Sequence, residues 1–344
     1  MKTYYKNTLV TMIKHKPQPI ALEVIRVLKT RFDNFPEDTE NNRNAPFHEA
    51  FLNAFKDKIE KYVDNVPYFI SLASWLHGLN TTLGQSFFEN VAHILSNGEK
   101  RTFKNCKITA KQQNAILEII TDLKNGQRTP NLEEENKLIF QTDEDLVNAL
   151  DFTADVFIIE KDYIEAIELK SVRPNAGEMR GEKLKILSAK ACLKLLYPDK
   201  EIRYFIGFPF DPLSDTPTGY NKERFIKHLI EFEKYFDPKE VLLAGELWDR
   251  LSGEANTMEK LLNIINQIAK PDFLEKYEFI NNPENFEKDK ERYMKILEEW
   301  FLFNEIKIFT NYDNLKKSNY RLLNQELFKG GKYNFKRLKL LELL

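Results

Sequence analysis

The segment ADVFIIEKDYIEAIELKS, residues 154–171, constrains the fold of this chain more strongly than any other part of the sequence. Two runs rich in β-branched and aromatic residues flank Lys161 and Asp162, which is typical of an antiparallel hairpin. Apolar residues occupy both faces of each run, and this favours a buried hairpin over a surface hairpin with solvated charges. Charged side chains within buried strands need partners or a metal.

Hydrophobic spacing predicts further elements on both sides of this hairpin. A helix is expected over 181–197, and a third buried strand over 201–210. Gly78 and Asn80 are expected to break the chain before a helix whose N-cap is Thr81 or Thr82. Other predicted helices cover residues 20–32, 109–126, 239–253, 258–270 and 291–307.

Charge and cysteine content exclude several broad classes of protein. The 51 Lys and Arg residues nearly balance the 53 Asp and Glu residues, so no global charge indicates a nucleic-acid or membrane partner. Cys106 and Cys192 lack CxxC spacing, which excludes a disulfide scaffold and a cysteine-ligated structural zinc site. No stretch approaches the roughly 20 apolar residues of a membrane helix, and the N-terminus lacks the apolar run of a signal peptide. We therefore expect a cytoplasmic protein without a membrane partner.

Strand alternation brings charged residues of the hairpin together. Glu168 and Lys170 share one face at the end of the second run, whereas Glu165 lies on the other face and is expected to be structural. A turn at residues 161–162 places Asp155 of the first run roughly opposite this end. Two carboxylates and a lysine can thus converge, and such a site suits Mg²⁺, which prefers carboxylate oxygens and keeps several waters.

Asp155 and the E-x-K sequence formed by Glu168 and Lys170 resemble the PD-(D/E)xK signature of a nuclease superfamily that includes many type II restriction endonucleases. Ala154 stands where the family has proline, which contributes no ligand. The resemblance implies an α/β fold with a restriction-endonuclease-like αβββαβ core and a mixed sheet. It implies that Asp155, Glu168 and the backbone carbonyl of Leu169 hold Mg²⁺. It also implies that Lys170 orients the attacking water or helps to deprotonate it.

Glu89 is a further candidate for catalysis and metal binding. It lies beside the apolar stripe that includes Leu83, Phe87 and Val91 in the predicted helix. Many restriction enzymes with this core carry a glutamate on the first helix that reaches the metal, and the resemblance implies this role for Glu89. An exposed helix glutamate without a role is the alternative.

Basic residues after the E-x-K strand are candidates for DNA binding. Arg173 and Arg180 follow the strand where a metal-bound phosphate would run, and arginine can bind phosphate oxygens in a bidentate fashion. Lys183 is predicted to contact DNA as well. The recurrence of Lys183, Lys190 and Lys194 on one side of the helix is also typical of a solvated face.

The segment 316–339 is a second basic region. It contains eight Lys and Arg residues and a single acid, Glu326, with amide side chains interleaved. Bases contact phosphates and amides can read base edges, so Lys332, Lys336 and Arg337 are predicted DNA contacts. A basic terminal segment without function is the alternative.

The resemblance implies that residues 75–212 form a nuclease core. Residues 1–74 are predicted to form a helical N-terminal region. Residues 213–344 are predicted to form a mainly helical C-terminal region with the basic tail, which serves DNA binding or dimerisation. Over 75–210 the sequence resembles more narrowly a group of restriction endonucleases that cut GGNCC sites.

These features together predict a type II restriction endonuclease that hydrolyses phosphodiester bonds of double-stranded DNA with Mg²⁺ at a short specific site. A palindromic site implies a two-fold homodimer, because protein symmetry then matches DNA symmetry. A cognate DNA methyltransferase is the expected genetic partner. The alternatives are a repair or structure-specific nuclease with the same core, and a non-catalytic DNA-binding protein.

Overall fold

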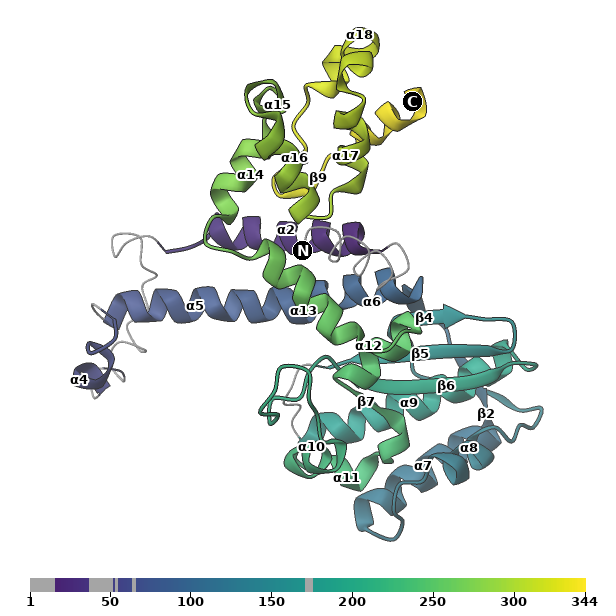
Figure 1. Ribbon diagram of the computed structural model, residues 1–344. Coiled ribbons are helices and arrows are strands. Elements are labelled where there is room, and N and C mark those ends of the chain that lie inside the picture. The colour runs from purple at the N-terminus through teal and green to yellow at the C-terminus, as the bar shows by residue number, and fades with distance from the viewer. Residues whose placement is uncertain (1–15, 37–51, 53–54, 64–65, 171–175) are drawn as a thin grey trace. The chain divides into compact units, whose positions relative to one another are not determined.

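The computed structural model describes residues 16–36, 52, 55–63, 66–170 and 176–344 (Figure 1). The chain folds as two compact units. Unit 1 contains Phe88–Lys260, and unit 2 contains the described part of Lys14–Phe87 together with Leu261–Leu344. This division differs from the three predicted ranges, because the sheet of unit 1 continues beyond residue 212 and both terminal regions contribute to unit 2.

Unit 1 is built on a five-stranded mixed sheet with the strand order β1, β4, β5, β6, β7. β4 is antiparallel to both β1 and β5, whereas β6 is parallel to both β5 and β7. This arrangement and the surrounding helices confirm the predicted α/β fold with a restriction-endonuclease-like core. The strands are β1 (Glu99–Phe103), β4 (Phe152–Ile159), β5 (Tyr163–Leu169), β6 (Glu201–Phe208) and β7 (Val241–Leu243).

The predicted hairpin is formed by β4 and β5. Val156 pairs with Ile167, and Ile159 pairs with Ile164. The turn between the strands is closed by the Glu160 backbone N–H, which donates to the Tyr163 carbonyl at 2.9 Å. Because β4 and β5 lie inside the sheet between β1 and β6, most of their apolar side chains are buried, as the two-sided pattern predicts.

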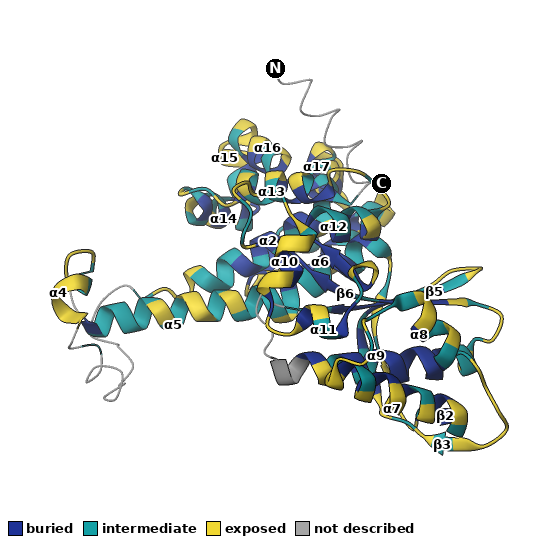
Figure 2. Cartoon of the chain, turned by 90° about the horizontal axis from the view of Figure 1, so that it is seen from below, coloured by how far each residue is buried: buried dark blue, intermediate teal, exposed yellow. Residues whose placement is uncertain are grey.

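Helices cover both faces of this sheet. α9 (Ala176–Leu196) lies against one face, backed by α7 (Ala110–Asn125) and α8 (Leu132–Ile139), and α6 (Phe88–Ser96) and α12 (Gly245–Ser252) lie against the other (Figure 1). Figure 2 shows α9 largely buried. Both faces of the strands are therefore shielded from solvent. The smaller elements of unit 1 are β2 (Lys107–Thr109), β3 (Leu146–Asn148), α10 (Lys222–His228), α11 (Phe232–Tyr235) and η3 (Pro238–Glu240).

Two sequence predictions for unit 1 and its border were wrong. The segment 239–253 does not form one helix, because Val241–Leu243 is buried as the edge strand β7 and the helix begins only at Gly245. The chain is also not broken near residue 78. Helix α5 runs through Val66–Thr82, and a π-helical segment, η2 (Leu83–Phe87), connects it to α6.

Gly78 has a packing role instead of ending a helix. The guanidinium group of Arg31 lies against Gly78, so a Cβ atom at this position would require the Arg31 side chain to move. Nη1 of Arg31 donates a hydrogen bond to the Trp75 carbonyl at 3.3 Å, one turn earlier on α5. A glycine within a helix is therefore a weak indicator of a break when another side chain needs the space.

The described part of unit 2 is helical apart from one short hairpin. Its centre is aromatic: Phe273 stacks on Trp300 with ring centroids 5.2 Å apart, and Tyr293 contacts Phe309 at 4.6 Å. The predicted helix 291–307 is divided into two, because Phe301 adopts a positive φ of 57°. The described elements are α2 (Pro17–Phe32), α4 (Lys56–Ile59), α5, η2, α13 (Thr257–Ile268, which begins in unit 1), α14 (Phe273–Asn281), α15 (Asn285–Lys288), α16 (Lys290–Glu299), α17 (Phe303–Thr310), α18 (Tyr312–Leu323), β8 (Phe328–Lys329), β9 (Lys332–Tyr333) and η4 (Phe335–Leu343). None of the helices that the structure describes is both long and apolar enough to span a membrane.

Candidate active site

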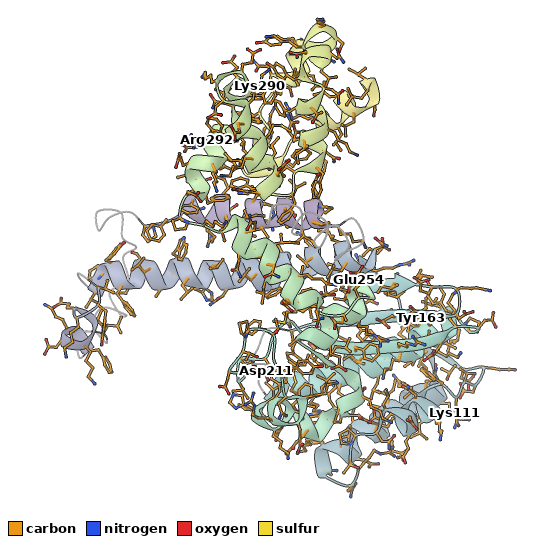
Figure 3. All side chains as sticks on the ribbon, viewed as in Figure 1. Lys111, Tyr163, Asp211, Glu254, Lys290 and Arg292 are labelled. Carbon is orange, nitrogen blue, oxygen red and sulfur yellow. The ribbon has the colours of Figure 1, made fainter. Side chains whose placement is uncertain are left out.

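The hairpin places the predicted catalytic carboxylates opposite each other. Val156 pairs with Ile167, and the next step of this register sets Asp155 opposite Glu168. The backbone N–H of Leu169 donates to Oδ2 of Asp155 at 3.0 Å, across the two strands. Asp155 is thereby held at the end of β5. Figure 3 labels Tyr163, the residue at which this strand begins.

Glu168 is buried, with 6% of its surface exposed, and depends on two lysines. Nζ of Lys185 lies 2.7 Å from Oε2 of Glu168, and Nζ of Lys170 lies 3.2 Å from Oε1. Burial, followed by the charge of Asp155, raises the pKa of Glu168, while the two lysines oppose this rise. A carboxylate in such surroundings is stabilised by any cation that approaches it.

Lys170 is fixed between two carboxylates. It donates to Oε1 of Glu182 on α9 at 2.7 Å, in addition to its ion pair with Glu168. Burial lowers the pKa of Lys170, but the hydrogen bond to Glu182 and the charge of Glu168 outweigh it, so this pKa lies above its ordinary value. Lys170 is therefore protonated at neutral pH.

Glu89 reaches the same site through a lysine. On α6, both carboxylate oxygens of Glu89 accept hydrogen bonds from Nζ of Lys100 at 3.0 Å. The same ammonium lies 3.5 Å from Oδ1 of Asp155. The Glu89 side chain is only 16% exposed, which differs from the alternative of a solvated helix glutamate.

Glu165 has the structural position that strand alternation predicts. Its carboxylate accepts hydrogen bonds from Arg250 of α12, from Nε at 3.0 Å and from Nη2 at 2.5 Å. Arg250 also lies over the Phe205 ring, 4.3 Å from its centroid. Glu165 therefore faces α12, while Glu168 faces α9, and the two glutamates of the strand have separate environments.

Tyr204 of β6 is a residue of the site that sequence reasoning missed. It pairs with Ala166, two residues before Glu168, so both side chains lie on the same face of the sheet. Tyr204 is 2% exposed, and its hydroxyl has no hydrogen-bond partner among the described residues. Burial, with a further contribution from the charges of Glu168 and Asp155, raises the pKa of Tyr204 well above its ordinary value.

Three more residues near the carboxylates were not predicted: Lys100, Glu182 and Lys185. Glu182 and Lys185 lie on α9 soon after the E-x-K strand and one helical turn apart, a spacing that could have indicated a shared partner. No such spacing indicated Lys100, because its partners in space, Glu89 and Asp155, lie on a helix and on another strand.

The donor set fits a hard divalent cation. Across the described part of the chain, no three His, Cys, Asp or Glu side chains are grouped so that they could hold a metal as they stand. Mg²⁺, however, needs only one or two carboxylates and fills its other positions with water. Asp155 and Glu168 face each other across the strands, and the unpartnered Tyr204 hydroxyl lies buried on their side of the sheet.

The predicted DNA contacts of unit 1 have different positions. Arg173 lies outside the described residues. Arg180 is exposed on α9. Lys183 is fully buried, and its Nζ lies 2.5 Å from Glu135 and 2.6 Å from Glu240, so the prediction that it contacts DNA was wrong. In the sequence, a buried lysine on a helix has the same spacing as a solvated lysine. Only its partners, which are distant in the sequence, distinguish the two.

The basic segment of unit 2 also contains one misassigned residue. Lys332 and Lys336 are exposed, as a DNA contact requires. Arg337 is fully buried and donates to both carboxylate oxygens of Glu305, at 2.9 and 2.8 Å, and to the Leu323 carbonyl at 2.7 Å. Arg337 therefore anchors the C-terminal segment within unit 2, and its predicted role in DNA binding was wrong.

The five-stranded mixed sheet has the restriction-endonuclease-like fold, and Asp155, Glu168 and Lys170, which resemble the PD-(D/E)xK signature, lie together at the β4–β5 hairpin. The family model described as "Type II restriction endonuclease, HinfI" matches residues 16–269. The type II restriction enzyme MjaII of Methanocaldococcus jannaschii is 50% identical over 359 aligned residues, which cover 96% of this chain and 97% of that protein. No solved structure matches the chain.

The chain therefore belongs to the HinfI family of type II restriction endonucleases. It is a site-specific endonuclease whose substrate is DNA. The predicted family and the predicted enzyme class are confirmed, and the comparisons favour them over a repair nuclease and over a non-catalytic DNA-binding protein.

Proposed function

We propose that this enzyme cleaves double-stranded DNA in a Mg²⁺-dependent reaction, with Asp155, Glu168 and Lys170 at its catalytic centre. The observation that carries the proposal is the register of the hairpin, which sets Asp155 opposite Glu168 at the end of β5. The hydrogen bond from the Leu169 N–H to Asp155 keeps this arrangement rigid. Both carboxylates are then positioned before DNA arrives.

The roles of the residues follow from their charges. Asp155 and Glu168, with the backbone carbonyl of Leu169, would hold the metal, and Glu89, which shares Lys100 with Asp155, would contribute through its own carboxylate. When bound, Mg²⁺ supplies Lewis acidity and stabilises charge on the scissile phosphate. Lys170 is held by Glu168 and Glu182, and we assign it the role of orienting the attacking water or helping to deprotonate it.

Plasmid cleavage tests the proposal directly. The purified protein with Mg²⁺ should convert a plasmid into discrete fragments, and EDTA should abolish this activity because the two carboxylates cannot replace the metal's Lewis acidity. Cleavage that continues in EDTA contradicts the metal dependence. A Mg²⁺-dependent smear without discrete fragments contradicts site-specific cleavage.

The site sequence and the assembly are finer proposals. GGNCC is the first sequence to test, because residues 75–210 resemble enzymes that cut it. A plasmid with one GGNCC site should be linearised, and a matched plasmid without it should stay circular.

Such a site is palindromic, so we also propose a homodimer, which sedimentation of the purified protein would show. We further propose a cognate methyltransferase as the genetic partner and a cytoplasmic location, because an endonuclease endangers the genome of its own host.

Replacing Arg180 by alanine should weaken DNA binding at every sequence to the same degree. Arg180 is exposed on α9, the helix that carries Glu182 and Lys185 of the site. Loss of one phosphate contact should lower the slope of log affinity against log salt concentration by about one. Fluorescence anisotropy at several salt concentrations measures this slope.

Lys111 offers a matched control for Arg180. It is an exposed base on α7, another helix of unit 1 (Figure 3). Lys111→Ala should leave the salt slope unchanged, because Lys111 is not among the basic residues that follow the E-x-K strand. Equal slopes for Arg180→Ala and the wild-type protein would show that Arg180 does not contact the DNA phosphates.

A further inference from the structure

Lys100 occupies the space between two carboxylates of the active site. Its Nζ lies 3.0 Å from both oxygens of Glu89 and 3.5 Å from Oδ1 of Asp155. A single positive charge is thus shared by two carboxylates from a helix and a neighbouring strand. These two side chains are candidate ligands of a divalent cation, so the ammonium lies where a metal would need to approach.

The backbone is irregular at this position. Glu99 pairs with Phe157 and Arg101 pairs with Ala154, so two residues of β4, one of them Asp155, lie opposite Lys100 alone. This is a β-bulge, a feature that occurs next to active sites and redirects side chains. The register of Arg101 with Ala154 sets Lys100 opposite Asp155, and the bulge adds Val156 opposite the same lysine.

Lys100 differs in accessibility from the carboxylates that it contacts. Its side chain is 49% exposed, whereas those of Glu89 and Asp155 are 16% and 15% exposed. β1 is also the edge strand of the sheet. The ammonium can therefore move into solvent by rotation of its own four-carbon chain, without unfolding any element.

Glu168 has its own cations and does not need Lys100. Lys170 and Lys185 lie 3.2 and 2.7 Å from its oxygens. Lys170 additionally donates to Glu182 and is 15% exposed, so it cannot move away as freely as Lys100. Among the three lysines, Lys100 is the most exposed one and bridges the Glu89 and Asp155 side of the site.

We propose that Lys100 is a positioning residue that holds Glu89 and Asp155 together in the metal-free enzyme. Its ammonium group is displaced from these two carboxylates when the metal binds. The inference rests on the proposed function, since it assumes a cation site at Asp155. Lys100 keeps the two carboxylates from repelling each other before a metal binds. It also competes with the metal, because both cations use the same oxygens.

Binding of Mn²⁺ alone, without DNA, tests this competition. Mn²⁺ accepts the same oxygen ligands as Mg²⁺, and electron paramagnetic resonance measures its free concentration. Lys100→Met keeps the length of the side chain and removes the competing charge, so Mn²⁺ should bind about three- to tenfold more tightly, which corresponds to a partly exposed ion pair worth up to about 1.4 kcal/mol. Lys100→Arg keeps the charge and should bind Mn²⁺ no more tightly than the wild-type protein.

Thermal unfolding supplies a second readout. Without metal, Lys100→Met should unfold at a lower temperature than the wild-type protein, because Glu89 and Asp155 lose their shared cation. Mn²⁺ should then raise the unfolding temperature of this variant by more than it raises that of the wild-type protein. Lys104→Met is the matched control, an exposed lysine just beyond the end of β1, and it should change neither quantity.

The outcomes separate this inference from the proposed function. If wild-type protein binds Mn²⁺ and Asp155→Asn does not, the metal site stands. Unchanged or weaker Mn²⁺ binding by Lys100→Met would then overturn the competition alone, and would leave Lys100 with a structural ion pair. If Lys104→Met increased the affinity for Mn²⁺ equally, the cause would be the change in net charge of the protein. This result would also overturn the competition between Lys100 and the metal. Failure of the wild-type protein to bind Mn²⁺ would overturn both proposals.

Discussion

Replacing Asp155 by asparagine should lower the rate of DNA cleavage by about a thousandfold or more, with little change in folding. The asparagine oxygen can still accept the hydrogen bond from the Leu169 N–H, so the end of β5 remains joined to β4. The negative charge that would hold the metal is lost. Stabilisation by a catalytic metal is worth several kcal/mol, and each 1.36 kcal/mol corresponds to about tenfold in rate.

Single-turnover cleavage of a plasmid at saturating protein concentration measures the loss of rate for Asp155→Asn. Circular dichroism and thermal unfolding show whether the fold is retained. DNA binding should be retained as well, because Asp155 carries a negative charge and contributes no attraction to phosphate. A variant that fails to bind DNA at all would indicate damage to the fold and would not support a catalytic role.

Glu165→Gln is the matched control for Asp155→Asn. Glu165 lies on β5, the strand of Glu168, but its carboxylate pairs with Arg250 on the opposite face. The control should cut DNA at nearly the wild-type rate, although it weakens a partly buried ion pair. If Asp155→Asn cuts as fast as Glu165→Gln does, Asp155 is not a residue of the catalytic centre.

Local pattern was sufficient to predict which charged side chains of the hairpin share a face. Alternation along residues 164–170 separates Glu165 from Glu168, and the structure shows these side chains on opposite faces. The two-residue turn signal fixed the hairpin closely enough to set Asp155 opposite Glu168. Both predictions depend on the two-residue period of a strand, which can be recognised from the local sequence alone.

The errors concern properties that depend on distant residues. Lys183 carries the same local signal as a solvated lysine, and its burial depends on Glu135 and Glu240, which are remote in sequence. Arg337 is buried for the same reason, because its partner Glu305 belongs to another helix. The short strand Val241–Leu243 has too few residues to show a period before the helix that follows it.

The buried cluster around Lys183 is the second place where a large effect is expected. Glu135 of α8, Glu240 of η3, and Lys183 and Lys190 of α9 are all 0% or 1% exposed. Lys183 contacts both glutamates, and Lys190 lies 3.2 Å from Glu240. Two negative and two positive charges thus compensate each other away from water. Such groups are stable only while each has its partner.

Replacing Lys183 by methionine should lower the free energy of unfolding by about 3–5 kcal/mol, the range for removing one partner of a buried ion pair. Urea titration followed by circular dichroism measures the loss. Lys185→Met is the control on the same helix. Its side chain is 25% exposed and contacts Glu168 and Glu182, so the expected loss is about 1 kcal/mol or less. Equal losses for the two variants would contradict the special role of the buried cluster.

The pH dependence of Lys183→Met distinguishes an uncompensated charge from a simple loss of packing. Burial raises the pKa of Glu135 even in the wild-type protein, and Lys183 opposes this rise. Without Lys183, the pKa of Glu135 should rise further, so the folded variant binds a proton more readily than its unfolded chain does. Stability of the variant relative to the wild-type protein should therefore recover as the pH falls towards this raised pKa, and should decrease again as the pH rises through it. A pH-independent difference would mean that lost packing, rather than the uncompensated buried charge among Glu135, Glu240 and Lys190, explains the effect.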